Sequence, residues 1–317
     1  MTLDSTSAIA ALTELDGIGD SRAIELYETF GSLTAIQDAP DGAFDDFHYV
    51  DAETRRQFET LDDLAAEWHE RFEEYQDRGI DVIGYGDESY PDSLRAFHAP
   101  PIIYARGDVT LLSEPSVSIS GSRAADDHAN EWTHHLAGDL ATEGLVVVSG
   151  GAAGVDTAAH RGTLSRGGTT IVVFGTGLDR PYPEENAEVF EEVVDQGGLL
   201  ISHRRPTAGP RGYAFRQRNE TISALSRAVV IVATDGSGGT MAQHRDAISQ
   251  GKAVFVPDPS HGFEPRAGIE TILDDGEGTA VKSSGEIVEW FESGDDAPDR
   301  APSGNEDGGQ RSLDDWG

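Results

Sequence analysis

The stretch that decides the fold is LVVVSGGAAGVDTAAHRG, residues 145–162. A short run of apolar, mostly β-branched residues comes first, a glycine-rich turn follows, and apolar residues at helical spacing come last. A strand that is apolar along its whole length is buried on both faces, as strands of parallel sheets are. The stretch therefore predicts a strand, a tight loop and a helix, which is the repeating unit of an open α/β sheet.

The same unit recurs from about residue 79 onward. Helical segments are expected at 124–143, 153–166, 184–196 and 239–250. The apolar runs are, in chain order, IDVIGYG, PIIYARG, SVSISGS, LVVVSGG, TTIVVFG, GLLIS, AVVIVAT and KAVFVP. This alternation predicts a Rossmann-like, doubly wound α/β domain with a mainly parallel sheet over residues 79–292.

Two flanking segments differ from this pattern. Residues 1–78 are predicted to form a small helical domain, in which LDGIGDSRAIELYETFGS (15–32) has the pattern of a helix-hairpin-helix motif. Such a hairpin can offer backbone amides to a DNA phosphate, but it also serves as a packing element. We favour packing because Asp16 and Asp20 flank it. Residues 293–317 are too polar to fold alone and are predicted to be a disordered acidic tail.

The composition is strongly acidic, with 58 Asp and Glu against 23 Lys and Arg and a net charge of −35. Lysine occurs only as Lys252 and Lys282, a balance that indicates adaptation to a salty cytoplasm. The chain has no cysteine, no membrane-length apolar run and no signal-like start, so we expect a cytoplasmic protein. His128, His134 and His135 lack zinc-ligand spacing, and no metal is expected.

Glycine- and serine-rich loops follow three of the predicted strands, at 120–123, 149–156 and 175–186. Carboxyl ends of parallel strands meet at one edge, where glycines and free helix N-termini suit an anion such as phosphate. Tight-turn geometry alone is the alternative explanation. None of the loops carries a dinucleotide fingerprint, a P-loop or a nucleophile elbow, so no cofactor and no catalytic residue is expected.

Residues 196–219, the acid-free segment, contain no Asp or Glu. The segment follows the run GLLIS and carries arginines with interleaved aromatics, Tyr213 and Phe215, which we expect in a loop. Arginine suits phosphate oxygens, and aromatic rings suit unpaired bases. Pairing of the arginines with carboxylates elsewhere, and a core role for Phe215, remain alternatives. The arginines are Arg204, Arg205, Arg211, Arg216 and Arg218.

These motifs, in this order, resemble the DNA-processing protein A (DprA/Smf) family over roughly residues 10–258. The resemblance implies a non-enzymatic protein that binds single-stranded DNA, forms a homodimer and loads a RecA/RadA-type recombinase during DNA uptake. It maps the family's Gly-Ser-Arg loop and its arginine–asparagine element onto this chain. The predicted DNA-binding residues are then Gly121, Ser122, Arg123, Ser149, Gly150, Arg204, Arg205, Arg211, Phe215, Arg216, Arg218 and Asn219.

The chain departs from the family pattern beside this element. Where Phe-Pro-x-Arg-Asn-Arg is usual, FRQRNE stands here, so Arg216 replaces the proline and Glu220 the last arginine. His203 also stands where glutamate is usual. Glu220 weakens the expected DNA pocket, while Arg216 adds charge back to it. We expect no winged helix of the kind that ends some members, because the tail is too short and too polar to form one.

Two other functions fit parts of the pattern. GSGGTMAQ (236–243) resembles a loop of nucleotide phosphoribohydrolases, but Gln243 stands near the position of their glutamate, and an amide is no general base. A nucleotide-sensing module, with a closed pocket in place of a groove, is the third possibility. If DNA binds at molar salt, stacking carries more of the affinity, so we expect a shallow salt dependence and a contribution from Tyr213 or Phe215.

Overall fold

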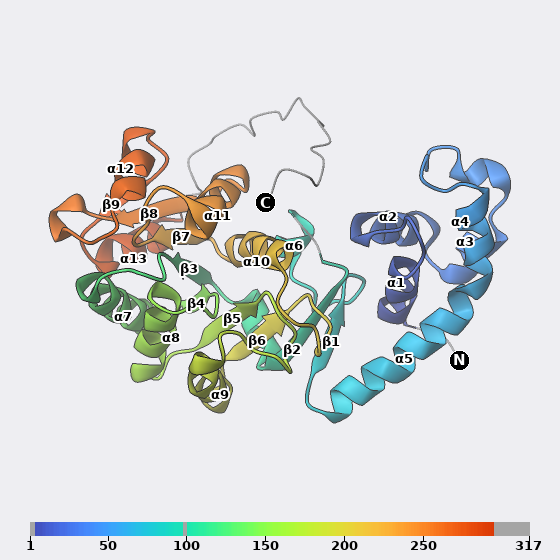
Figure 1. The fold of residues 1–317 in the computed structure, drawn as a ribbon, viewed down its shortest axis with the longest axis horizontal. Coiled ribbons are helices and arrows are strands. Elements are labelled where there is room, and N and C mark those ends of the chain that lie inside the picture. The colour runs from blue at the N-terminus through green and yellow to red at the C-terminus, as the bar shows by residue number, and fades with distance from the viewer. Residues whose placement is uncertain (1–3, 98–99, 295–317) are drawn as a thin grey trace.

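The computed structural model describes residues 4–97 and 100–294. Within them one sheet of nine strands runs through the molecule, and a group of helices stands beside its β1 end (Figure 1). The strands are β1 (Asp81–Gly84), β2 (Ile102–Gly107), β3 (Ser116–Ser120), β4 (Val146–Ser149), β5 (Thr170–Phe174), β6 (Leu199–Ser202), β7 (Ala228–Ile231), β8 (Ala253–Pro257) and β9 (Thr279–Val281).

The α-helices are α1 (Ser5–Thr13), α2 (Asp20–Phe30), α3 (Leu33–Asp38), α4 (Ala52–Gln57), α5 (Leu61–Asp77), α6 (Asp92–Arg95), α7 (Asp127–Thr142), α8 (Val155–Ser165), α9 (Ala187–Asp195), α10 (Gly212–Leu225), α11 (Gly238–Ser249), α12 (Ala267–Asp274) and α13 (Ser284–Ser293). Short 3₁₀ turns lie at Asp41–Phe44, Phe58–Thr60, Val109–Ser113, Glu184–Asn186 and Pro259–His261. The predicted strands and the four predicted helical segments are confirmed.

The strand order is β1-β2-β6-β5-β4-β3-β7-β8-β9. The seven strands β6, β5, β4, β3, β7, β8 and β9 are neighbours in this order and all pair in parallel, which confirms the mainly parallel Rossmann-like sheet. The first two strands differ, because β1 pairs antiparallel with β2 and β2 antiparallel with β6. In the described part of the connection between β1 and β2 the only helix is the one-turn α6, which is enough because antiparallel neighbours need no long crossover.

Both faces of the sheet are covered, which explains why its strands are apolar throughout. Along β4, Val147 packs among residues of α7, α8 and α13, while Val146 and Val148 pack on the other face beside α10. Successive side chains of a strand point to opposite faces, so each face receives its own core. The α9 side of β5 and β6 forms a further core that reaches Trp68 and Phe72 of α5.

Helices α1 to α5 form a small core of their own and contact the sheet through β1. Ile18, at the centre of the predicted hairpin, is buried in that core, as a packing role requires. At the contact, the Thr6 hydroxyl lies 3.2 Å from both carboxylate oxygens of Asp87. A Cβ built on Gly84 would lie 2.0 Å from Thr6 Oγ1, so glycine allows the close approach of α1 to the sheet.

Some elements were not predicted from the sequence. The short edge strand β9 and the helices α12 and α13 follow the last predicted run. In the residues that the structure describes, no helix is long and apolar enough to cross a membrane. The predicted tail, 293–317, lies outside the described residues from position 295 on.

Candidate nucleic-acid interface

The carboxyl ends of β3, β4, β5, β6 and β7 lie at one edge of the sheet because these strands are parallel. We call the loops that follow them, with the N-terminal halves of α10 and α11, the carboxyl rim. The loops contact one another: the Ser122 amide donates to the Ala233 carbonyl at 2.7 Å, joining the loops after β3 and β7. Gly121 packs against Val155 at the start of α8, so the loop after β3 also contacts the helix after β4.

The first part of the acid-free segment, residues 203–211, is a loop bound to its neighbours. The Gly177 amide donates to the Ala208 carbonyl at 2.8 Å, and the Asp179 amide donates to the Pro206 carbonyl at 2.9 Å. Arg205 turns toward the helical part of the chain, where it forms an ion pair with Glu14 and lies 4.6 Å from the ring centre of Trp68. Its contacts therefore join the rim to α1 and α5.

The second part of the segment is helical, whereas the sequence had suggested a loop. Helix α10 begins at Gly212, so Phe215, Arg216, Arg218 and Asn219 project from a helix that crosses the rim. Pro206, Gly209 and Pro210 in the preceding residues concealed the helix start. On α10, a fixed backbone spaces these side chains at helical intervals.

Aromatic rings lie at the start of α10. Tyr213 is exposed, and the Arg204 guanidinium lies 5.3 Å from its ring centre. Phe215 packs against Gly175, at the end of β5, and meets the ring of Tyr182 edge-on with centroids 6.1 Å apart. Tyr182 itself is half exposed. Exposed rings beside arginines are what stacking of unpaired bases requires.

Arg218 reaches from α10 to the loop after β4. Its Nη1 atom lies 3.7 Å from Asp156 Oδ2, and both side chains are almost wholly buried. The guanidinium lies directly over Gly150, where a Cβ would be 1.3 Å from Nη1. Burial raises the pKa of Asp156, although the charge of Arg218 opposes the shift, and burial lowers the pKa of Arg218.

Buried polar groups fix the loop beneath Arg218. The Ser149 hydroxyl donates to the Ile119 carbonyl at 2.6 Å, which joins β4 to β3. His160 Nε2 lies 2.7 Å from the Gly150 carbonyl, and its Nδ1 lies 2.8 Å from Thr170 Oγ1. Burial lowers the pKa of His160 to about 4, so the ring is neutral and its Nε2–H donates to the carbonyl.

Asn219 links α10 to the start of α11. Its side-chain amide donates to the Gly239 carbonyl at 3.2 Å, and the residue is buried. Gln243, near the position where the phosphoribohydrolases carry their glutamate, is also buried on α11. Asn219 therefore positions two rim helices relative to each other.

The remaining predicted residues are exposed arginines. Arg123 lies on the loop after β3, Arg211 precedes α10, and Arg216 projects from its second turn. Over residues 4–97 and 100–294, none of the three forms an ion pair. In a chain with so many carboxylates, unpaired arginines on one rim are available to an external anion.

Sequence reasoning missed two residues of this rim. Asp156, the second residue of α8, is the partner of Arg218, and Tyr182 stands beside Phe215. A tyrosine between two prolines in a loop after a predicted strand was a usable signal for Tyr182. No sequence signal pairs Asp156 with Arg218, since they are far apart in the chain and meet only through the fold.

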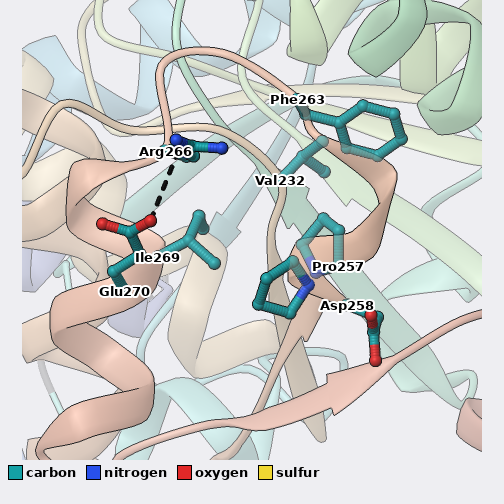
Figure 2. A pocket seen from close by; sticks show the side chains of 8 residues that line it. Val232, Pro257, Asp258, Phe263, Arg266, Ile269 and Glu270 are labelled. Atoms are coloured by element: carbon teal, nitrogen blue, oxygen red, sulfur yellow. Dashed lines mark ion pairs between the residues drawn. The ribbon is translucent and has the colours of Figure 1, made fainter.

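Two hollows lie away from the carboxyl-rim arginines, and they differ greatly in size. A cavity of about 20 Å³ lies at the ends of β7 and β8, walled by Val232, Pro257, Phe263 and Ile269 beside the Arg266–Glu270 ion pair (Figure 2). That volume is close to the space of one water molecule. An open hollow of about 710 Å³ lies between α9 and the Arg78–Asp179 ion pair. Among the described residues no cluster of His, Asp and Glu could hold a metal ion.

Fold and rim together define a Rossmann-like α/β protein with an arginine-rich carboxyl rim and a helical N-terminal part. Residues 81–292 match the model of the family DNA recombination-mediator protein A, and the chain belongs to this family. It is 31% identical over 217 residues to the DNA processing protein DprA of Bacillus subtilis, over 68% of this chain and 72% of that protein. It is 33% identical over 180 residues to the protein Smf of Escherichia coli, over 56% of this chain but 48% of that protein.

Solved structures extend the likeness to the fold. DNA processing protein A of Streptococcus pneumoniae aligns with a TM-score of 0.75 at 26% identity, over 90% of this chain and 98% of that one. The protein from Helicobacter pylori, whose structure is described for its single-stranded DNA binding mode, aligns with a TM-score of 0.60 at 30% identity. That alignment covers 68% of this chain and 96% of the Helicobacter chain.

Proposed function

We propose that this chain binds single-stranded DNA along the carboxyl rim and catalyses no reaction there. The observation that carries the proposal is the set of unpaired arginines, Arg123, Arg211 and Arg216, on a rim that also presents the exposed rings of Tyr182 and Tyr213. Charge on an otherwise acidic surface suits a phosphate backbone, and the rings suit unpaired bases. The Helicobacter relative, described as binding single-stranded DNA, supports the same assignment.

The proposed DNA-contacting set keeps the residues expected from the sequence except Arg205, whose ion pair with Glu14 assigns it to the contact with the helical part of the chain. The loops supply Gly121, Ser122, Ser149 and Gly150 around the buried Arg218, and α10 supplies Phe215 and Asn219. The absence of a reaction rests on Gln243, because a buried amide at the position of a catalytic carboxylate takes up no proton at neutral pH. We further propose, from family membership, a homodimer that delivers the strand to a RecA/RadA-type recombinase.

The test is fluorescence anisotropy with a labelled oligo-dT at high KCl, on the wild type and on Arg123→Ala. We expect tight binding by the wild type and about a tenfold loss in the variant, the order expected when a charged hydrogen bond is removed. Arg266→Ala is the control and should bind normally. Arg266 directly precedes α12 and already forms ion pairs with Glu264 and Glu270. A wild type that stays folded but binds no oligo-dT at any KCl concentration would refute the proposal.

A further inference from the structure

Asp156 is a negative charge in the middle of a rim that is proposed to receive phosphates. The residue is 6% exposed, so its carboxylate is inside the protein and not on its surface. Burying a charge is costly unless a partner compensates it. A carboxylate in this place therefore needs a stabilising interaction that offsets the cost of its burial and of its repulsion of DNA phosphates.

The contacts of Asp156 show what it holds. Its Oδ2 accepts a hydrogen bond of 3.3 Å from the Ala152 amide, which fixes the carboxylate to the glycine-rich loop. The same oxygen lies 3.7 Å from Arg218 Nη1. Asp156 thus connects the loop after β4 with a side chain of α10.

Arg218 depends on this connection. Its guanidinium is confined over Gly150, and its Nε is buried without a hydrogen-bond partner. A guanidinium carries N–H donors in a rigid fork, and the ion pair with Asp156 engages the Nη1 end. Without the carboxylate, a long arginine side chain in this position gains more by turning out into water than by staying buried.

From this geometry we propose, on the basis of the proposed function, that Asp156 is a positioning residue that holds the Arg218 guanidinium in the orientation that receives a DNA phosphate. The proposal predicts a change in DNA affinity opposite in direction to the one that simple charge repulsion predicts. Plain electrostatics says that removing a carboxylate from a DNA-binding rim strengthens binding, because a repulsion disappears. Positioning says that removing Asp156 weakens binding, because Arg218 is no longer held in place.

Glu220 offers a matched comparison. It lies on α10 two residues beyond Arg218, and it is half buried. Replacing it with glutamine removes one negative charge from the same helix. We expect Glu220→Gln to bind single-stranded DNA as tightly as the wild type or a few-fold more tightly.

The experiment measures oligo-dT affinity by anisotropy across a KCl series for the wild type, Asp156→Asn, Arg218→Gln, the double variant and Glu220→Gln. We expect Asp156→Asn to lose about tenfold in affinity, with a salt slope shallower by about 0.7, equivalent to one phosphate contact on a single strand. In the Arg218→Gln background, Asp156→Asn should cause no further loss. Equal or tighter binding by Asp156→Asn, or an equal loss in both backgrounds, would overturn the positioning role.

Two further outcomes keep the test decisive. If Asp156→Asn does not fold, Arg218→Lys replaces it: a fixed fork predicts about a tenfold loss although the charge is kept, and a loss below twofold overturns the proposal. If the folded wild type binds no oligo-dT, the proposed function itself fails. That result differs from a wild type that binds and an Asp156→Asn variant that binds equally well, which overturns only the positioning role.

Discussion

Two neighbouring parts of the acid-free segment, the loop 203–211 and helix α10, both carry arginines, but these arginines have different contacts. In the loop, residues 203–211, Arg205 forms an ion pair with Glu14 and lies over Trp68, so its charge joins the rim to the helical part of the chain. In α10, Arg218 lies over Gly150 at the sheet edge and Arg216 projects without an ion pair among the described residues. An arginine-rich, acid-free composition marks a region. The place of each guanidinium, on the rim beside the loop after β4 or against α1 and α5, distinguishes a site for an external anion from an internal contact.

The largest effect is expected from Gly150→Ala, which displaces Arg218 without removing its charge. The new Cβ would lie 1.3 Å from Nη1 and 2.6 Å from Asp156 Oδ2. Both atoms are at the far ends of side chains, so the ion pair must move while the backbone stays. We expect a folded protein that has lost about 1.5–3 kcal/mol of oligo-dT binding, the range for one hydrogen bond to a charged group. Anisotropy gives the affinity, and thermal unfolding verifies the fold.

Gly209→Ala is the control for this change in the loop part. No atom lies within 4 Å of a Cβ at Gly209, and its backbone does not require glycine. We expect binding and unfolding as in the wild type. Equal affinities for Gly150→Ala and Gly209→Ala would show that the place of Arg218 over the loop does not matter, and the contrast between the two parts would fail.

Arg205→Ala tests the other side of the comparison. It removes an exposed ion pair and a cation–π contact, which together contribute about 1 kcal/mol to stability. We expect unfolding in urea, at fixed KCl, to shift by that amount while oligo-dT affinity stays unchanged. The sequence assigned Arg205 to DNA, so a loss of affinity similar to that of Arg123→Ala would restore that assignment and remove the distinction.

The sequence was sufficient for the fold and for the glycine-rich loops of the carboxyl rim, because both follow from local patterns. Apolar strands such as 146–149 predict burial on both faces, and glycines after them predict the loops of the carboxyl rim. The Asp156–Arg218 pair depends on strand order and on the path of α10, which no local pattern contains. The start of α10 was concealed by the glycine and the two prolines before it, and β9 is too short, at three residues, to show a periodicity.

An effect no larger than that of Arg205→Ala is expected at Asp246 of α11, a carboxyl on the α10 side of the rim whose ionised form is destabilised. Burial, with repulsion from Glu220, raises the pKa of Asp246 to about 6, and Arg216 and Arg245 only partly oppose the shift. The folded pKa lies above the unfolded value of 3.8, so the folded protein binds the extra proton. Protonation of Asp246 therefore stabilises the folded protein increasingly as pH falls through 6, and this stabilisation is absent at pH 7.5.

Asp246→Asn removes that cost at neutral pH. Because the side chain is partly solvated, we expect a gain of about 1 kcal/mol in the free energy of unfolding at pH 7.5, and no gain near pH 4, where the wild-type carboxyl is protonated. Urea unfolding at both pH values, in the same KCl, measures the difference. An equal gain at both pH values would assign the effect to packing of the amide and not to charge. A gain confined to neutral pH would show that repulsion between Asp246 and Glu220 lowers stability beside Arg216, where an external phosphate is proposed to bind. At Arg205, by contrast, the nearby charge of Glu14 is opposite in sign and forms an ion pair.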